Sequence, residues 1–140
     1  MRLPGFKKPR AKKGDALMTN TILLKLDDGE DIVESVKKLA QENSIEYGVF
    51  VAANGTIKDC ELVYNEPKQG ITKGKFKEEF KIRAISGQIE RIKGNEVKAV
   101  IRVSLLGARS GSKSGELLKG KASRALEIQV RKVNVGKIIK

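Results

Sequence analysis

F-K-I-R-A-I-S-G-Q-I-E-R-I-K-G-N-E-V-K-A-V-I-R-V-S-L-L, residues 80–106, is the stretch that decides the fold. Two apolar runs, 80–91 and 96–106, flank Lys-Gly-Asn, which is the clearest hairpin signal in the chain. Side chains of a strand alternate between two faces. In the second run one face carries Val97, Ala99, Ile101, Val103 and Leu105, and the other carries Lys98, Val100, Arg102 and Ser104. We therefore expect two antiparallel strands that bury one face.

Apolar runs on both sides of this hairpin predict further strands. These runs are 21–26, 47–53, 60–64 and 124–133. Asn54-Gly55, between the second and third of them, is typical of a turn or a bulge. We expect residues 65–75 to form a loop, because they hold a proline, two glycines and three lysines.

A single segment has the periodicity of a helix. Asp28 can cap its free N–H groups, and Glu30 and Asp31 favour the positive end of the helix. Apolar side chains then recur at helical spacing, at Ile32, Val33, Val36, Leu39 and Ala40. We expect the helix to end near Asn43. One main helix among about six or seven strands predicts an α+β fold with a largely antiparallel sheet.

Length and composition favour one folded domain. The chain has 140 residues, of which 39% are hydrophobic, so it can bury a sizeable core. No apolar run approaches the length of a membrane span. Cys60 is the only cysteine, which rules out an internal disulfide and favours a reducing compartment. We expect a cytoplasmic protein, associated with the nucleoid if it binds DNA.

The formal net charge of +12 favours anionic partners, with nucleic acid first and a membrane surface second. Residues 1–17 hold few apolar side chains, so we expect a flexible basic arm there, followed by a domain at 18–140. The arm has one acidic residue, Asp15, and its basic residues are Arg2, Lys7, Lys8, Arg10, Lys12 and Lys13. Because only Leu3 and Phe6 could insert into lipid, we expect no membrane partner.

The loop after the hairpin, G-A-R-S-G-S-K-S (107–114), matches the phosphate-binding P-loop in part. That motif needs a glycine where this chain has Ser112, and a helix must follow it. Here E-L-L-K-G runs into Gly120, which is poor helix-forming sequence. We expect a polar, mobile connection between strands, from which Arg109 and Lys113 contact DNA phosphates.

The residues of common catalytic and metal sites are missing. The chain has no histidine, so it has no histidine base, no Ser-His pair and no histidine metal ligand. One cysteine cannot build a thiolate zinc site, and Cys60 lies in an apolar run where we expect a buried structural thiol. We therefore expect no enzymatic activity, no metal and no cofactor.

The order of five segments resembles the PPC domain, the plants-and-prokaryotes-conserved domain. The segments are L-x-x-G-E-D (26–31), V-A-A-N-G-T-I-K-D-C-E-L-V-Y (51–64), F-K-E-E-F-K-I-R-A-I-S-G-Q-I (76–89), V-I-R-V-S-L (100–105) and S-G-E-L-L-K-G-K-A-S-R-A-L-E-I-Q-V (114–130). The resemblance covers about residues 20–132. It implies a compact α+β domain that forms homotrimers, and in plants it implies association with DNA through a separate basic hook. Stand-alone members occur in prokaryotes.

Many prokaryotic members of this family carry His-x-His on one strand and a third histidine after the loop, and these can hold a metal. By the same resemblance, Val100, Arg102 and Glu116 stand at those three positions here. Valine cannot ligate and arginine stays cationic, so we expect no metal at this site. Three alternatives remain for Arg102 and Glu116: an ion pair that replaces the metal as a structural tie, two separately solvated side chains, or a small anion bound to Arg102.

Two functions follow from these observations. The first is a non-enzymatic protein that binds double-stranded DNA with weak sequence preference, mostly through phosphate contacts of the basic arm. Aromatic residues make up 4% of the chain, which argues against single-strand recognition by base stacking. The alternative is a small-molecule-binding or enzymatic module, with a pocket between subunits near Asn54, Gly55, Arg102 and Glu116.

Overall fold

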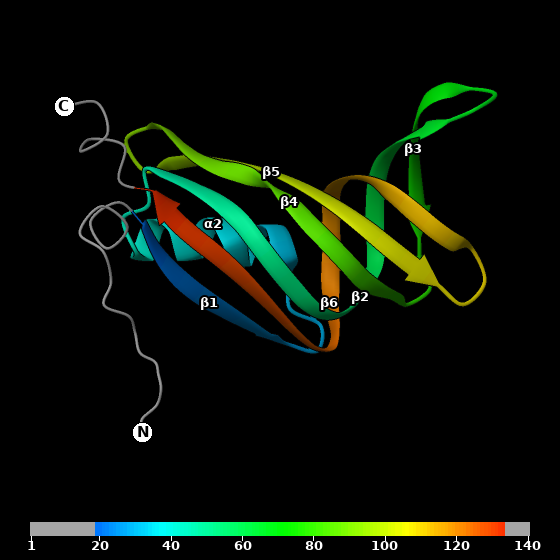
Figure 1. The fold of residues 1–140 in the computed structure, drawn as a ribbon, viewed down its shortest axis with the longest axis horizontal. Coiled ribbons are helices and arrows are strands. Elements are labelled where there is room, and N and C mark those ends of the chain that lie inside the picture. Colours follow the sequence, from blue (N-terminus) through cyan, green and yellow to red (C-terminus); the bar gives the residue numbers. More distant parts are fainter. Residues whose placement is uncertain (1–18, 134–140) are drawn as a thin grey trace.

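The computed structural model describes residues 19–133, which form one antiparallel sheet and one helix (Figure 1). The elements in chain order are β1 (Thr19–Asp27), α2 (Ile32–Glu42), β2 (Tyr47–Glu66), β3 (Gly70–Phe76), β4 (Phe80–Lys93), β5 (Glu96–Gly107) and β6 (Gly111–Val133). The order of strands in the sheet is β1-β6-β5-β4-β2-β3. The predicted α+β fold with one main helix is confirmed.

The long strand β6 curls the sheet back on itself. Its first part pairs with β5, its last part pairs with β1, and β2 pairs with most of its length. Because β2 also pairs with β4, and β4 with β5, these four strands pair in a closed cycle. β1 and β3 are attached outside the cycle, to β6 and to β2, and Figure 1 shows β3 projecting from the body of the molecule.

The core lies between the concave face of the curled sheet and α2, which packs against β1, β5 and β6. The face of β5 predicted to be apolar is the face that is buried, whereas Lys98 and Arg102 on the other face are exposed. Side chains from α2 and from all strands except β3 join one buried cluster, in which Phe80 is completely enclosed. Burial of such side chains contributes roughly 1.5–3 kcal/mol each.

The helix begins three residues later than the predicted cap implies. Asp31, not Asp28, is the N-cap, and its side chain accepts a hydrogen bond from the N–H of Glu34 at 2.9 Å. Asp28 instead accepts a hydrogen bond from the N–H of Arg124 on β6 at 2.7 Å and pairs with Lys58 at 3.1 Å. These partners hold the pKa of Asp28 below its ordinary value, with the backbone N–H as the main cause. Asn43 closes the helix, as predicted.

Two segments predicted to be irregular are strands. Within 65–75, residues from Gly70 onward belong to β3, an edge strand whose exposed and half-buried residues alternate along its length. Residues from Gly111 onward belong to β6, so the loop after the hairpin is short. Of the turn or bulge predicted at Asn54-Gly55, the structure has no turn: β2 continues through it with a shift of register beside Gly55, as a bulge would give. The proposed arm, residues 1–17, lies outside the described residues.

Candidate functional site

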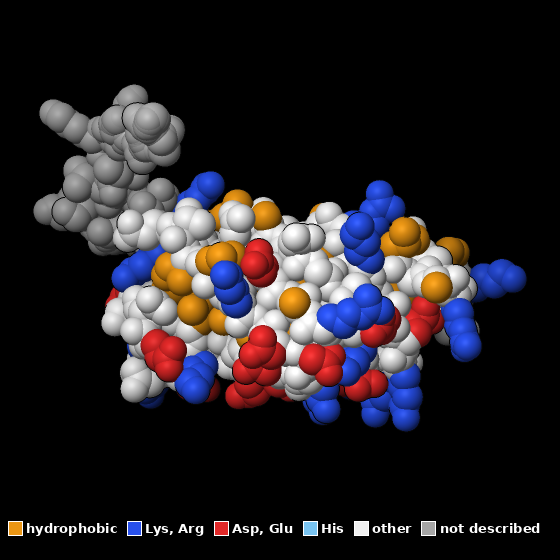
Figure 2. Space-filling view, turned by 90° about the horizontal axis from the view of Figure 1, so that it is seen from below, with side chains coloured by type: hydrophobic (Ala, Val, Ile, Leu, Met, Phe, Trp, Pro, Cys, Tyr) orange, Lys and Arg blue, Asp and Glu red, His pale blue; other side chains and the backbone are white. Residues whose placement is uncertain are grey.

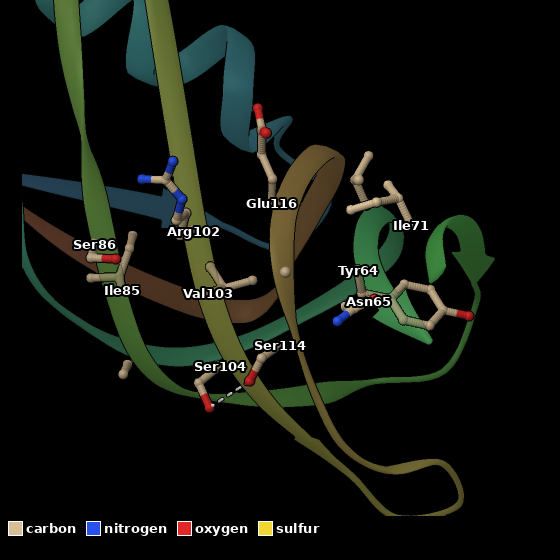
Figure 3. Close-up of a pocket in the computed structure, with 13 residues that line it drawn as sticks. Tyr64, Asn65, Ile71, Ile85, Ser86, Arg102, Val103, Ser104, Ser114 and Glu116 are labelled. Atoms are coloured by element: carbon tan, nitrogen blue, oxygen red, sulfur yellow. Dashed lines mark hydrogen bonds between the residues drawn. The ribbon is translucent and has the colours of Figure 1, made fainter. Parts of the chain in front are cut away.

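One pocket lies among β2, β3, β4, β5 and β6, beside the paired residues Val63 and Glu116 of β2 and β6. It has a volume of about 540 Å³ and is formed by side chains of all five strands (Figure 3). Its wall is mostly apolar, with contributions from Val63, Ile71, Ala84, Ile85 and Val103. Its polar groups are those of Tyr64, Asn65, Ser86, Arg102, Ser104, Ser114 and Glu116. This composition suits a small amphipathic ligand.

Arg102 and Glu116 lie on neighbouring strands at this pocket. They are direct cross-strand partners in the register of β5 and β6. No ion pair within 4.0 Å joins them, and in the described residues 19–133 neither charged group has a side-chain partner. Figure 3 shows both side chains at the same end of the pocket, with a gap between their charged groups. The proposed ion pair is therefore not formed, which leaves the two alternatives of solvated side chains and a bound anion.

Asn54 and Gly55 do not line the pocket. Gly55 has a φ of 137° and lies at the shift of register between β2 and β6. A Cβ atom on this glycine would lie 2.4 Å from the carbonyl oxygen of Ala125 and 2.9 Å from the Cα of Leu126. A side chain cannot be accommodated so close to a neighbouring backbone. The Asn54-Gly55 pair thus shapes the close approach of two strands and is not part of the pocket.

The turn between β5 and β6 binds a carboxylate of its own chain. One oxygen of Glu78, Oε2, accepts hydrogen bonds from the N–H groups of Arg109 at 3.2 Å and Ser110 at 3.3 Å. The hydroxyl of Ser110 donates to the other oxygen, Oε1, at 2.5 Å. These donors, the hydroxyl above all, lower the pKa of Glu78. The turn therefore has the donors of an anion site, and Glu78 already occupies them.

The two basic residues predicted in this connection differ in their surroundings. Arg109 is exposed, and nothing in the described structure pairs with its guanidinium. Lys113 is half-buried, and its ammonium lies 5.4 Å from the ring centroids of Tyr64 and Phe76. A cation over aromatic faces is stabilised by about 0.5–1 kcal/mol at exposed sites. Lys113 is thus held against the sheet, whereas Arg109 can reach an external anion.

The structure brings together a cluster of lysines that the sequence does not predict, because residues 65–75 have the composition of a loop and β3 lies within them. A second pocket of about 390 Å³ is lined by Lys75 on β3, Lys77 just beyond the end of β3, and Lys119 and Lys121 on β6. We call these four residues the lysine surface. In the view of Figure 2, Lys and Arg side chains are concentrated toward one end of the molecule, with Asp and Glu side chains among them. The period-two pattern of K-G-K-F-K (73–77) and K-G-K (119–121) was the sequence signal that could have revealed it.

The donor atoms at the pocket do not fit a metal. Arg102 is cationic and exposed, Val100 has no donor atom, and Glu116 supplies one carboxylate. In the part of the chain that the structure describes, no three His, Cys, Asp or Glu residues gather as a metal site. Among those same residues, no helix is long and apolar enough to cross a membrane.

Residues 15–134 match the sequence model of the Plants and Prokaryotes Conserved (PCC) domain. A plant- and prokaryote-conserved (PPC) protein from Pyrococcus horikoshii is 22% identical, with a TM-score of 0.70 over 82% of this chain and 79% of its own. A metal-containing protein from Archaeoglobus fulgidus is 22% identical, with a TM-score of 0.69 over 95% and 86%. A proposed DNA-binding protein from Bacteroides thetaiotaomicron is 20% identical, with a TM-score of 0.69 over 82% and 79%. No curated protein matches the chain by sequence.

Proposed function

This chain belongs to the Plants and Prokaryotes Conserved domain family, and from that premise we propose that it is a non-enzymatic protein that binds double-stranded DNA. The observation that carries the proposal is the formal net charge of +12, with six basic residues and one acidic residue in 1–17. Lysine and arginine gain affinity for DNA by displacing the counterions condensed on its phosphates. The similar protein from Bacteroides thetaiotaomicron is described as a proposed DNA-binding protein, which supports the proposal of DNA binding.

The described side chains favour binding over catalysis. Burial raises the pKa of the Cys60 thiol to about 11, so this sulfur stays protonated and is a poor nucleophile at neutral pH. Glu78 and Glu79 accept hydrogen bonds from serine hydroxyls and have lowered pKa values, so they are unsuited to act as bases near pH 7. The chain has no histidine that could take this role.

We propose that the chain assembles as a homotrimer that presents three basic arms to one DNA molecule. Exposed apolar residues on the outer face of the sheet, Leu23 and Val51, offer surface for contact between copies. Linking three arms raises the local concentration of the second and third after the first has bound. Static light scattering should give the mass of three chains at micromolar concentration. A stable monomer would contradict the trimer while leaving DNA binding to be judged by its own test.

Neutralising the arm tests the proposed function in the full chain. The arm variant carries glutamine at Arg2, Lys7, Lys8, Arg10, Lys12 and Lys13. Its matched control carries glutamine at six exposed basic residues of the domain, Lys25, Lys38, Lys81, Arg83, Lys93 and Lys98. Affinity for a labelled duplex is measured over a salt series, because log affinity falls with log salt by about 0.9 for each phosphate neutralised. The arm variant should lose most of the affinity and slope, and the control should lose little.

Specificity for base sequence should be weak. Phosphate contacts position a protein on the duplex and carry no sequence information. We expect two duplexes of unrelated sequence to bind with affinities within a few-fold of each other. A preference of a thousand-fold or more, which specific proteins show, would mean that base edges are read.

The pocket at Arg102 and Glu116 supports a second candidate function, binding of a small anionic molecule. The supporting observation is that the guanidinium of Arg102 faces a largely apolar pocket and lacks an ion-pair partner among the described residues. Native mass spectrometry of the purified chain should then show a co-purifying small molecule. The molecule should be lost in Arg102→Gln and retained in Lys98→Gln, a matched change on the same face of β5.

A further inference from the structure

We propose that the lysine surface is a second DNA contact, built into the folded sheet and independent of the basic arm. It would bind the phosphate backbone of duplex DNA through Lys75, Lys77, Lys119 and Lys121. The inference rests on the proposed function, since it names where the folded domain meets the same partner. The experiment below separates failure of one from failure of the other.

The register of three strands places these lysines on one face. On β2, Glu61 is the direct partner of Lys75 on β3 and of Lys119 on β6. Residues paired across a sheet point to the same side, and so do alternate residues along a strand. Lys121 follows Lys119 at this spacing on β6, and Lys77, just beyond the end of β3, lines the same pocket as Lys75. The result is two pairs of lysines, about 10 Å apart because one strand lies between them.

The carboxylates beside the lysine surface leave it with excess positive charge. Glu61 is 8% exposed and pairs with Lys73 at 3.5 Å, outside the set of four. Asp59 is exposed at the edge of the same pocket and is the second acidic group there. None of the four lysines has an ion-pair partner within 4.0 Å in the described part of the chain. Four exposed ammonium groups therefore surround two carboxylates, and one of these, Glu61, is already paired with Lys73.

The chemistry of this surface suits a phosphate backbone better than base edges. Lysine presents a compact charge on a flexible stem, without the planar fork that reads a guanine edge or grips a carboxylate. The aromatic ring that lines the pocket, Phe76, is half-buried between neighbouring rings and cannot offer a free face for base stacking. Single-strand binders rely on such faces, so duplex DNA is the expected form.

Rigidity distinguishes this contact from one made by an arm. Lys75 and Lys119 are fixed by backbone pairing with β2, so binding loses side-chain freedom but no backbone freedom. A preorganised charged surface can set the orientation of the folded domain on DNA, whereas a flexible segment supplies affinity without orientation.

The test compares two quadruple variants of the full chain, each with the same change in net charge. The first carries glutamine at Lys75, Lys77, Lys119 and Lys121, and the control carries glutamine at Lys25, Lys38, Lys93 and Lys98 on other elements. Binding to a labelled duplex of arbitrary sequence is followed by fluorescence anisotropy from 50 to 200 mM salt. Circular dichroism confirms that both variants are folded.

If all four lysines meet phosphates, the slope of log affinity against log salt becomes shallower by about 3.6 in the first variant. The factor by which affinity falls between 50 and 200 mM salt is then roughly 150 times smaller in this variant than in the unmodified chain. The control should keep nearly the original slope. Equal slopes in the two variants would overturn the inference while leaving DNA binding intact, and absence of binding by the unmodified chain would overturn the proposed function itself.

A second variant tests the surface without removing any lysine. Asp59 has a φ of 49°, a conformation that asparagine also adopts readily, so Asp59→Asn should preserve the fold. Removing this negative charge should tighten duplex binding several-fold at low salt. A matched change at the far end of the sheet, Glu90→Gln, should have a smaller effect. If the Asp59→Asn variant binds duplex DNA no more tightly than the Glu90→Gln variant, the inference is contradicted. This result counts even if the quadruple variant fails to fold.

Discussion

Replacing Gly55 by alanine should destabilise the fold severely, because this residue shapes the crossing of β2 and β6. The φ of 137° lies in a region that only glycine adopts readily, at a cost of about 1–3 kcal/mol for other residues. The added Cβ would also lie 2.4 Å from the carbonyl oxygen of Ala125, which is backbone and cannot move aside alone. Overpacking of this kind adds about 1–3 kcal/mol. We expect a total loss of about 2–6 kcal/mol in the free energy of unfolding.

The matched control is Gly94→Ala in the hairpin turn. Gly94 also has a positive φ, 58°, but a Cβ there meets nothing within 4 Å. Its cost should be the backbone term alone, about 1–2 kcal/mol. At roughly 3–4 °C per kcal/mol, Tm should fall by about 15 °C in Gly55→Ala and about 5 °C in Gly94→Ala. Thermal unfolding by circular dichroism at one protein concentration measures both. Equal decreases of Tm in the two variants would refute the close approach of β2 and β6 at Gly55.

Three further predictions concern ionisable groups and metal. Hydrogen bonds lower the pKa of Glu78 in the folded chain below its ordinary value of 4.5. The contribution of Glu78 to stability is therefore complete above pH 4.5 and is lost as the pH falls through the pKa of the folded chain. The Tm should consequently fall below pH 4.5, and it should fall less steeply in Glu78→Gln. The Cys60 thiol, buried and with a pKa of about 11, should react with a thiol reagent at pH 8 only after denaturation, and rapid labelling of the native chain would contradict its burial. Elemental analysis of unchelated protein should find no stoichiometric metal, because Val100, Arg102 and Glu116 lack a suitable donor set; one equivalent of zinc would refute this.

Local pattern was enough to predict the centre of the fold. The alternation in 96–106 correctly divided β5 into a buried face and an exposed face, and Lys-Gly-Asn correctly marked the turn before it. The helical spacing of Ile32, Val36, Leu39 and Ala40 likewise identified the buried face of α2. These features depend on neighbours within a few residues, which is the range over which sequence periodicity carries information.

Features that depend on distant pairing were not predictable in this way. The composition of 65–75 predicts a loop where β3 forms, because an edge strand can be polar, and the lysines of β3 alternate with glycine and half-buried residues instead of large apolar ones. The same error hid the lysine surface. Periodicity placed Arg102 on the exposed face, and the resemblance placed Glu116 near it. Whether their charged groups meet depends on the curl of the sheet, which no local pattern specifies.

The pairing of β1 with the last part of β6 has a consequence for how the chain acquires its structure. Thr19 is aligned with Val133, and β6 also contributes a partner to β2 and to β5. During synthesis, the backbone N–H and C=O groups of β1 and of much of β2 therefore lack their strand partner until β6 has been made. Such distant pairing slows folding, since the loop must close before the contacts that stabilise it can form. The growing chain consequently passes through a stage in which unpaired strands can associate with other chains, and rapid capture by β6 determines how much reaches the native sheet.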